Sequence, residues 1–175
     1  MDRRPHFREP VWRTPHQAFC RCPPAALLPW LTDDSSLTQR LMERCGSRFR
    51  VELIRQRRAR PEPSEARALG LRGGAFALVR EVYLCCGDER WVYARTVIPD
   101  TTAAGRYRRL RRMGERPIGA FLFAQPRLQR ADLEIAQADA GGAAAGSWGR
   151  RSVFRVDGRP LLVTEYFLPA FTGTL

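Results

Sequence analysis

Apolar and polar residues alternate along several stretches of the chain with the two-residue period of a β-strand. Residues 49–59 form one such stretch, and residues 130–140 predict another strand. Residues 75–99 predict two strands joined by a Gly-Asp turn, and residues 150–169 predict two more joined by an Asp-Gly turn. Strands joined mainly by short turns indicate an antiparallel sheet.

A helical pattern precedes the first of these strands. Its apolar spacing predicts a helix over residues 36–44. Asp34 or Ser35 is the expected N-cap, and Gly46 is expected to end the helix.

Further helical patterns lie between the strands in separate blocks. Residues 101–114 predict an amphipathic helix, and residues 116–123 predict a short helix with Pro117 at its first position. Residues 60–74 are rich in Pro and Gly, so we expect a break there. Helices in separate blocks beside an antiparallel sheet are typical of a single α+β domain.

One carboxylate lies in the middle of a predicted strand. With period-two alternation, Glu165 shares a face with Leu161, Val163 and Phe167. An ionised carboxylate placed among such side chains without a partner would cost several kcal/mol. Glu165 must therefore have a partner or a function.

Arginines interrupt the first predicted hairpin in the same way. Arg80 lies between Leu78 and Val82, and Arg95 lies between two apolar residues of the next strand. One explanation is a buried arginine–glutamate pair with no ligand, which breaks even energetically at best. The other is a closed pocket that binds an anion through arginine and a hydroxyl through Glu165. The residues alone do not decide between these two explanations. A pocket of this kind would suit a small cyclic acid as its ligand.

Composition and charge limit the classes of function. With 175 residues, 44% of them hydrophobic, the chain suits one domain with a real core. The net charge is +12, and all 30 basic residues are arginine, scattered apart from residues 55–60 and 106–112. We therefore expect a solvated surface that attracts small anions, and no nucleic-acid partner. The first 24 residues lack an apolar run of signal-peptide length and no stretch approaches a membrane span, so a cytoplasmic location is expected.

The cysteines and histidines disfavour metal and nucleophilic chemistry. The number of cysteines is odd, and their C-x-C and C-C spacings fit neither zinc sites nor a compact disulfide framework. Both histidines, His6 and His16, lie near the start of the chain. With no phosphate loop or dinucleotide fingerprint either, we expect inert reduced thiols, no metal and no cofactor. The cysteines are Cys20, Cys22, Cys45, Cys85 and Cys86.

Six short motifs in series carry a resemblance to a known family. They are WLTDDSSLTQRL, LVREVYLC, ARTVIP, RPIGAFLF, WGRRS and GRPLLVTEYFLP. Over about residues 25–170, their order and spacing resemble those of the chorismate pyruvate-lyase (4-hydroxybenzoate synthetase) family. The resemblance implies a cofactor-free lyase that converts chorismate to 4-hydroxybenzoate and pyruvate for ubiquinone biosynthesis. It also implies an α+β fold of about six antiparallel strands, with helices on one side and two helical flaps over an internal ligand cavity.

The resemblance also implies site residues, position by position. Arg80 in LVREVYLC matches the arginine that holds the ring carboxylate, and Glu165 in LVTEYFLP matches the glutamate that meets the 4-hydroxyl. These two are the expected catalytic residues. Leu37 and Ile118 match apolar flap residues whose backbone groups approach the ligand carboxylate. Arg95 in ARTVIP matches a further basic residue near the cavity.

The sequence predicts an N-terminal arm followed by one domain, and two other classes of function are considered. Residues 1–24 are expected to be an irregular arm, and residues 25–175 a chorismate-lyase-like domain that acts as a monomer. A non-catalytic domain of the same fold, which senses small acids in some transcription regulators, is the first alternative. Such domains usually follow a DNA-binding helix-turn-helix, for which the arm is too short. A nucleic-acid binder, the second alternative, rests on charge alone.

Overall fold

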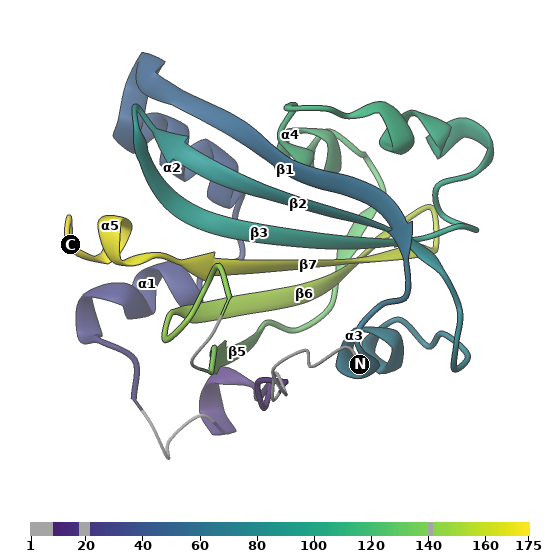
Figure 1. Ribbon diagram of the computed structural model, residues 1–175, viewed down its shortest axis with the longest axis horizontal. Helices are drawn as coiled ribbons and strands as arrows, with labels where there is room; N and C mark the ends of the chain where they lie inside the picture. Colours follow the sequence, from purple (N-terminus) through teal and green to yellow (C-terminus); the bar gives the residue numbers. More distant parts are fainter. Residues whose placement is uncertain (1–8, 18–21, 140–141) are drawn as a thin grey trace, which may run out of the picture.

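The protein is built around one antiparallel sheet (Figure 1). The computed structural model describes residues 9–17, 22–139 and 142–175. The strands pair in the order β1-β2-β3-β7-β6-β4, and β5 also pairs with β6. Their bounds are β1 Phe49–Ala59, β2 Ala77–Cys86, β3 Glu89–Pro99, β4 Leu128–Arg130, β5 Glu134–Gln137, β6 Trp148–Val156 and β7 Arg159–Phe167.

The sheet has seven strands rather than about six, because two short strands share one edge. β4 pairs with residues 154–156 of β6, and β5 pairs with residues 148–151 of the same strand. The stretch 130–140, expected as one strand, is therefore the end of β4, a break and then β5. β4 and β5 therefore lie end to end along the same edge of β6.

Both predicted hairpins are confirmed. β2 turns into β3 at Gly87, where φ is 58°, and β6 turns into β7 at Asp157 and Gly158, where φ is 49° and 75°. Two successive residues with positive φ are characteristic of the type I′ turn, whose twist matches that of paired strands. The register of the second hairpin therefore counts outward from the pair Val156 and Arg159.

Helices cover both faces of the sheet, which corrects the expectation that they lie on one side. α2 packs its Leu41 in the same core cluster as Leu84 of β2. On the opposite face, Leu69 at the end of α3 packs with Val79 and Leu162. The helices are α1 Leu28–Leu31, α2 Leu37–Cys45, α3 Pro63–Ala68, α4 Ile118–Phe123 and α5 Pro169–Thr172, with 3-10 helices η1 Pro15–Gln17, η2 Ala25–Leu27, η3 Gly46–Arg48 and η4 Gly105–Arg112.

α2 begins one residue later than predicted, with Ser36 as its N-cap rather than Asp34 or Ser35. The Ser36 hydroxyl accepts a hydrogen bond from the backbone N–H of Gln39 at 3.4 Å. The carboxylate of Asp33 accepts the N–H of Ser35 at 2.6 Å, so the preceding residues form a separate turn.

The helix expected over residues 101–114 is a 3-10 helix, η4, over a shorter range. Its buried residues explain the winding. Tyr107, Leu110 and Met113 are each three positions apart and are at most 7% exposed. A helix with three residues per turn aligns all three side chains, whereas the α-helical period would spread them over about 120°.

α3 lies in residues 60–74, where a break is expected. Pro63 occupies the first turn, and the side chains of Glu62 and Glu65 form a capping box with each other's backbone N–H groups. Both features mark helix starts, so the signal was present in the sequence. The prediction of a break followed instead from the abundant Pro and Gly around this short helix.

The described part of the N-terminal arm is attached to the sheet. Arg13 exchanges two backbone hydrogen bonds with Ile135 of β5, at 3.1 and 2.7 Å. The Trp12 ring lies 5.9 Å from that of Tyr166 on β7. Residues 9–17 therefore form an ordered strap, while His6 lies outside the described residues.

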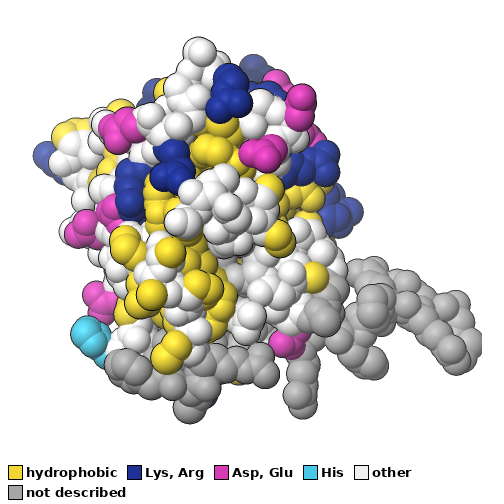
Figure 2. Space-filling view, turned by 90° about the vertical axis from the view of Figure 1, so that its left-hand side faces the viewer, with side chains coloured by type: hydrophobic (Ala, Val, Ile, Leu, Met, Phe, Trp, Pro, Cys, Tyr) yellow, Lys and Arg dark blue, Asp and Glu magenta, His cyan; other side chains and the backbone are white. Residues whose placement is uncertain are grey.

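The surface in Figure 2 is mixed in charge. Arginines and carboxylates are interspersed on this face, with apolar side chains between them. This distribution agrees with the expectation of solvated, scattered arginines. Within the described ranges, no helix is both long and apolar enough to cross a membrane.

Cys45 and Cys86 form a disulfide, which corrects the expectation of reduced, unpaired thiols. Cys45 ends α2 and Cys86 ends β2, so the bond joins this helix to the sheet. Because 41 residues separate the two cysteines, no local spacing motif could reveal the pair. Cys22 and Cys85 are free, and Cys20 lies outside the described residues.

Reduction of this disulfide is expected to lower the free energy of unfolding by about 4 kcal/mol, because the bond closes a long loop in the unfolded chain. Urea unfolding with and without a phosphine reductant measures the change. Cys45→Ser should reproduce the loss, whereas replacement of the exposed Cys22 by serine should not. An unfolding midpoint that ignores the reductant would contradict the bond.

Candidate active site

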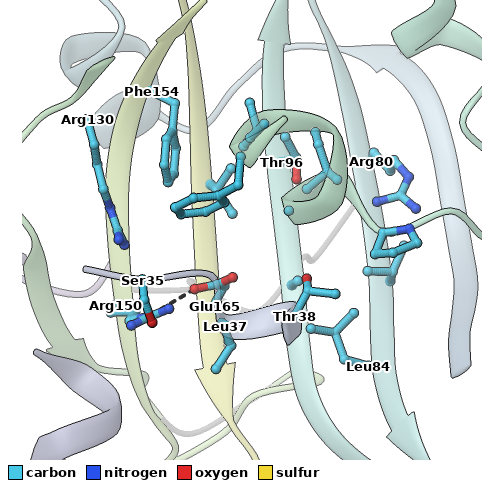
Figure 3. A pocket seen from close by; sticks show the side chains of 18 residues that line it. Ser35, Leu37, Thr38, Arg80, Leu84, Thr96, Arg130, Arg150, Phe154 and Glu165 are labelled. Carbon is cyan, nitrogen blue, oxygen red and sulfur yellow. Dashed lines mark hydrogen bonds and ion pairs between the residues drawn. The ribbon is translucent and has the colours of Figure 1, made fainter. Parts of the chain in front are cut away.

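A pocket lies between the sheet and the two flaps α2 and α4 (Figure 3). Its floor is apolar and comes from three neighbouring strands: Val82 and Leu84 of β2, Ala94 of β3 and Val163 of β7. Four charged side chains enter this apolar space: Arg80, Arg130, Arg150 and Glu165. A few polar groups converging in an apolar pocket are characteristic of small-molecule sites.

Glu165 is paired with Arg150, a residue that the sequence analysis did not single out. The two lie opposite each other on β7 and β6, and Arg150 Nε donates to Glu165 Oε2 at 2.8 Å. Arg150 Nη1 also donates to the carbonyl oxygens of Trp30 and Asp33, at 2.8 and 2.6 Å. Arg150 is buried and Glu165 is partly buried, with side-chain exposures of 2% and 15%. Among the described residues, the second carboxylate oxygen of Glu165 has no hydrogen-bond donor.

A local signal could have found Arg150. WGRRS precedes the Asp157–Gly158 turn, and counting outward from a two-residue turn places Arg150 directly opposite Glu165. The buried ion pair and the pocket, left as alternatives above, therefore occur together at Glu165.

Arg80 is the most buried charge of the pocket, at 1% exposure. Its Nη2 donates to the carbonyl oxygens of Gly114 and Arg116, both at 2.8 Å, in the segment that leads into α4. Its Nε is buried without an acceptor, and no carboxylate of the described chain forms an ion pair with it. Burial without a counter-charge lowers the pKa of Arg80 to about 10. An anion in the pocket would relieve both deficits.

Arg95 does not enter the pocket, contrary to the expectation that it lies near the cavity. It lies on the opposite face of the sheet, where Nε donates to Glu65 at 2.7 Å and Nη1 to Glu81 at 2.8 Å. The cause is a register shift between Leu84 and Cys85, which places Thr96 rather than Arg95 opposite Arg80. A shift of one residue turns every following side chain to the other face.

Leu37 and Ile118 line the pocket as expected. They are the first residues of α2 and α4, so the first turn of each flap adjoins the cavity. Both side chains are buried, at 3% and 8% exposure. The structure therefore brings Arg80, Glu165, Leu37 and Ile118 together and leaves Arg95 outside.

The two flaps meet at Gly119 of α4 and Thr38 of α2. A Cβ atom added at Gly119 would lie 2.6 Å from the Thr38 hydroxyl oxygen and 3.2 Å from its Cβ. Real side chains essentially never approach so closely, so this contact requires glycine.

Gly119→Ala is accordingly expected to push the flaps apart. If the strain amounts to about 1–2 kcal/mol, affinity for a ligand held under the flaps should fall by about tenfold. Calorimetric titration with 4-hydroxybenzoate measures this. Thr38→Ala in the same chain removes the clashing hydroxyl and should restore part of the affinity. An unchanged affinity in Gly119→Ala would show that flap contact is irrelevant to binding.

No metal site accompanies these residues in the described part of the chain, where no group of three or more His, Cys, Asp or Glu side chains could hold an ion. Arginine donors, the Glu165 carboxylate and the hydroxyls of Ser35, Thr38 and Thr96 are the polar side-chain groups that line the pocket. Such groups bind and orient an organic anion with a hydroxyl group.

Known proteins of similar sequence point to one family. A family model described as chorismate lyase matches residues 7–173. A probable chorismate pyruvate-lyase of Methylococcus capsulatus is 48% identical over 151 residues, which cover 81% of this chain and 93% of that protein. The chorismate pyruvate-lyase of Erwinia tasmaniensis is 38% identical over 146 residues, which cover 83% of this chain and 80% of that protein.

Solved structures share the fold at lower identity. The ligand-binding domain of a putative GntR-family transcriptional regulator from Bordetella bronchiseptica has a TM-score of 0.50 and 18% identity, covering 69% of this chain and 84% of that one. PhnF from Mycobacterium smegmatis has a TM-score of 0.52 and 21% identity, covering 78% and 65%. At these identities the likeness concerns the fold alone. The family match is different, since it spans the strap, both flaps, both hairpins and every charged residue of the pocket, and this chain belongs to the chorismate lyase family.

Proposed function

We propose that this protein cleaves chorismate to 4-hydroxybenzoate and pyruvate, a reaction that would feed ubiquinone biosynthesis. One observation carries the proposal: the same closed pocket holds a buried arginine with no counter-charge and a carboxylate with one oxygen free. Relatives named chorismate pyruvate-lyase, which match most of the chain, support it.

Three of the four charged side chains of the pocket have a role in this reaction. Arg80 binds the ring carboxylate, and the free oxygen of Glu165 accepts a hydrogen bond from the C4 hydroxyl. Leu37 and Ile118 close the pocket from the two flaps, so that backbone groups approach the ligand and water is excluded. Arg150 holds Glu165 in place through the 2.8 Å ion pair.

The chemistry demands positioning more than activation. The C3–O bond breaks with its electron pair on the enolpyruvyl oxygen, and the C4–H electron pair becomes a ring double bond. The released proton ends on the methylene carbon of the enolpyruvyl group, which gives pyruvate. Because the ring becomes aromatic, the reaction is strongly downhill. The protein needs only to orient the dianion and stabilise the departing negative charge.

A sensing domain without chemistry is the second candidate, since the related folds include a ligand-binding domain of a transcriptional regulator. Such a domain would bind 4-hydroxybenzoate or chorismate in the same pocket and release no pyruvate. The two candidates therefore differ in turnover and not in binding.

The deciding experiment mixes purified protein with chorismate and follows pyruvate release, before and after dialysis against a chelator. Turnover that the chelator leaves unchanged is expected, because the proposed mechanism uses no metal or nucleotide. Binding without pyruvate release would favour the sensing domain. A loss of activity that one divalent metal restores would overturn the cofactor-free mechanism.

Three further expectations belong to this proposal. The product 4-hydroxybenzoate should bind in the pocket, which calorimetry tests. The protein should act as a monomer, which light scattering during size-exclusion chromatography measures. Its cytoplasmic location stays a prediction, to be tested by fractionation of cells that express the chain.

A further inference from the structure

The charges of the pocket exceed what the proposed product requires. The described chain contributes three arginines and one glutamate to the lining, a formal charge of +2. Arg150 is neutralised by Glu165, and Arg80 is assigned to one carboxylate. Arg130 remains as a third cation. If the product carries one carboxylate and Arg80 binds it, the positive charge of Arg130 has no counter-charge.

Arg130 is held firmly but not neutralised. It ends the short edge strand β4, where its Nε donates to the hydroxyl of Ser152 at 3.1 Å and its Nη1 to the carbonyl oxygen of Asp34 at 2.5 Å. Its guanidinium lies over the Phe154 ring, 5.0 Å from the centroid. Among the described residues, Nη2 has no acceptor and no carboxylate forms an ion pair with Arg130. Burial and the nearby charge of Arg150 lower its pKa, as expected for a cation that lacks a partner.

The position of Arg130 matches the shape of the substrate. In Figure 3, Arg80 and Arg130 lie on opposite sides of the pocket, with Glu165 between them. In chorismate the ring carboxylate and the hydroxyl are para to each other, and the enolpyruvyl ether is on the carbon next to the hydroxyl. A ring with its carboxylate at Arg80 and its hydroxyl at Glu165 therefore extends its enolpyruvyl group at the end of the pocket farther from Arg80.

We infer that Arg130 binds the enolpyruvyl carboxylate and stabilises the pyruvate that departs. This inference rests on the proposed function. When the C3–O bond breaks, the leaving enolpyruvyl group gains negative charge on its ether oxygen next to its carboxylate. A guanidinium already held by Ser152 and Asp34 meets that charge without reorganising, which is how preorganised donors accelerate a reaction.

The inference predicts that Arg130 affects the binding of substrate and product differently. 4-Hydroxybenzoate lacks the second carboxylate, so it gains nothing from Arg130, whereas chorismate and the transition state do. Arg130 therefore contributes to turnover and to the binding of dicarboxylates, and Arg80 contributes to both ligands.

The test compares Arg130→Gln with the wild type in two assays. Loss of the contact should lower kcat/KM for pyruvate release about a hundredfold, and the dissociation constant of 4-hydroxybenzoate should change by less than about threefold. A stable aromatic probe, 3-(carboxymethoxy)-4-hydroxybenzoate, carries the second carboxylate on an ether at the matching carbon. Its affinity should fall about tenfold or more in the variant. Arg127→Gln is the matched control, since this arginine is exposed and three residues away.

Other outcomes distinguish the inference from its alternatives. If Arg130 only fastens the flap through Asp34, the affinities for 4-hydroxybenzoate and for the probe should fall together, which would overturn the inference. A wild type that releases pyruvate, with Arg130→Gln equally active, would overturn it and leave the proposed function intact. A wild type that releases no pyruvate would overturn the proposed function itself. Should Arg130→Gln fail to fold, Arg130→Lys replaces it, because lysine keeps the positive charge and a long side chain. Its kcat/KM should fall about tenfold, with the affinity for 4-hydroxybenzoate unchanged. An equal fall in kcat/KM and in that affinity would overturn the inference.

Discussion

Arg80→Ala is expected to raise the dissociation constant of 4-hydroxybenzoate by about thirtyfold to several thousandfold, which corresponds to roughly 2–5 kcal/mol. The reason is that Arg80 is the charge of the pocket with neither a carboxylate partner nor an acceptor for its Nε. A ligand carboxylate bound to it is shielded from water by the flaps, so the contact is strong. Calorimetric titration measures the loss.

Fold stability should change less than binding in the same variant. Removal of Arg80 breaks its hydrogen bonds to Gly114 and Arg116, but it also removes a buried cation without a counter-charge. Urea unfolding of the empty protein measures this balance. Arg155→Ala is a matched control, because this arginine lies on β6 and is exposed. Unchanged product affinity in a folded Arg80→Ala protein would rule out the anchor role.

Glu165→Gln is expected to lower turnover by roughly tenfold to a thousandfold, equivalent to about 1.4–4 kcal/mol in the transition state. The change keeps the shape of the side chain and one acceptor oxygen, but it removes the charge that orients the substrate hydroxyl. Pyruvate-release rates measure the effect.

The same variant should also lose stability, because Arg150 is 2% exposed and depends on Glu165 for its counter-charge. Breaking a buried pair outright costs roughly 3–5 kcal/mol. Glutamine can still accept from Arg150, and two carbonyl oxygens stay bonded to it, so the loss should lie below that range.

A second substitution separates the two roles of Glu165. Adding Arg150→Met to Glu165→Gln removes the uncompensated charge, so stability should recover in part while turnover stays low. Thermal melts beside pyruvate-release rates report both quantities. Recovery of both stability and turnover in the double variant would mean that Glu165 serves only Arg150.

Several features of this protein follow from local sequence alone. Period-two alternation and the Asp157–Gly158 turn predict the β6–β7 hairpin, and the turn also sets its register. Glu165 and Arg80 stand out because charges on apolar strand faces need a reason. These predictions succeed because alternation and turn chemistry act over a few residues.

The first hairpin shows where local counting fails. Counted outward from its tight turn, Arg80 would oppose Arg95, and both would face the pocket. The bulge next to Trp91 adds one residue to β3, so Arg80 opposes Thr96 and Arg95 meets Glu81 instead. The alternation does not reveal the bulge, because residues 91–98 are mostly apolar on both faces of the strand. With the bulge in place, Trp91 is buried in the core cluster that contains Trp30 and Phe171.

The closure of the pocket also depends on tertiary packing. The sequence by itself determined the five long strands β1, β2, β3, β6 and β7, the two tight turns and most of the residues that need a partner. Only the packed structure decided the partners: Arg150 for Glu165, Cys86 for Cys45, and Thr38 of one flap against Gly119 of the other. The flap contact and the disulfide each join residues at least 41 positions apart, and such contacts depend on how α2 and α4 settle on the sheet. A local pattern carries no information on that docking, since the buried surfaces that drive it come from segments distant in the chain.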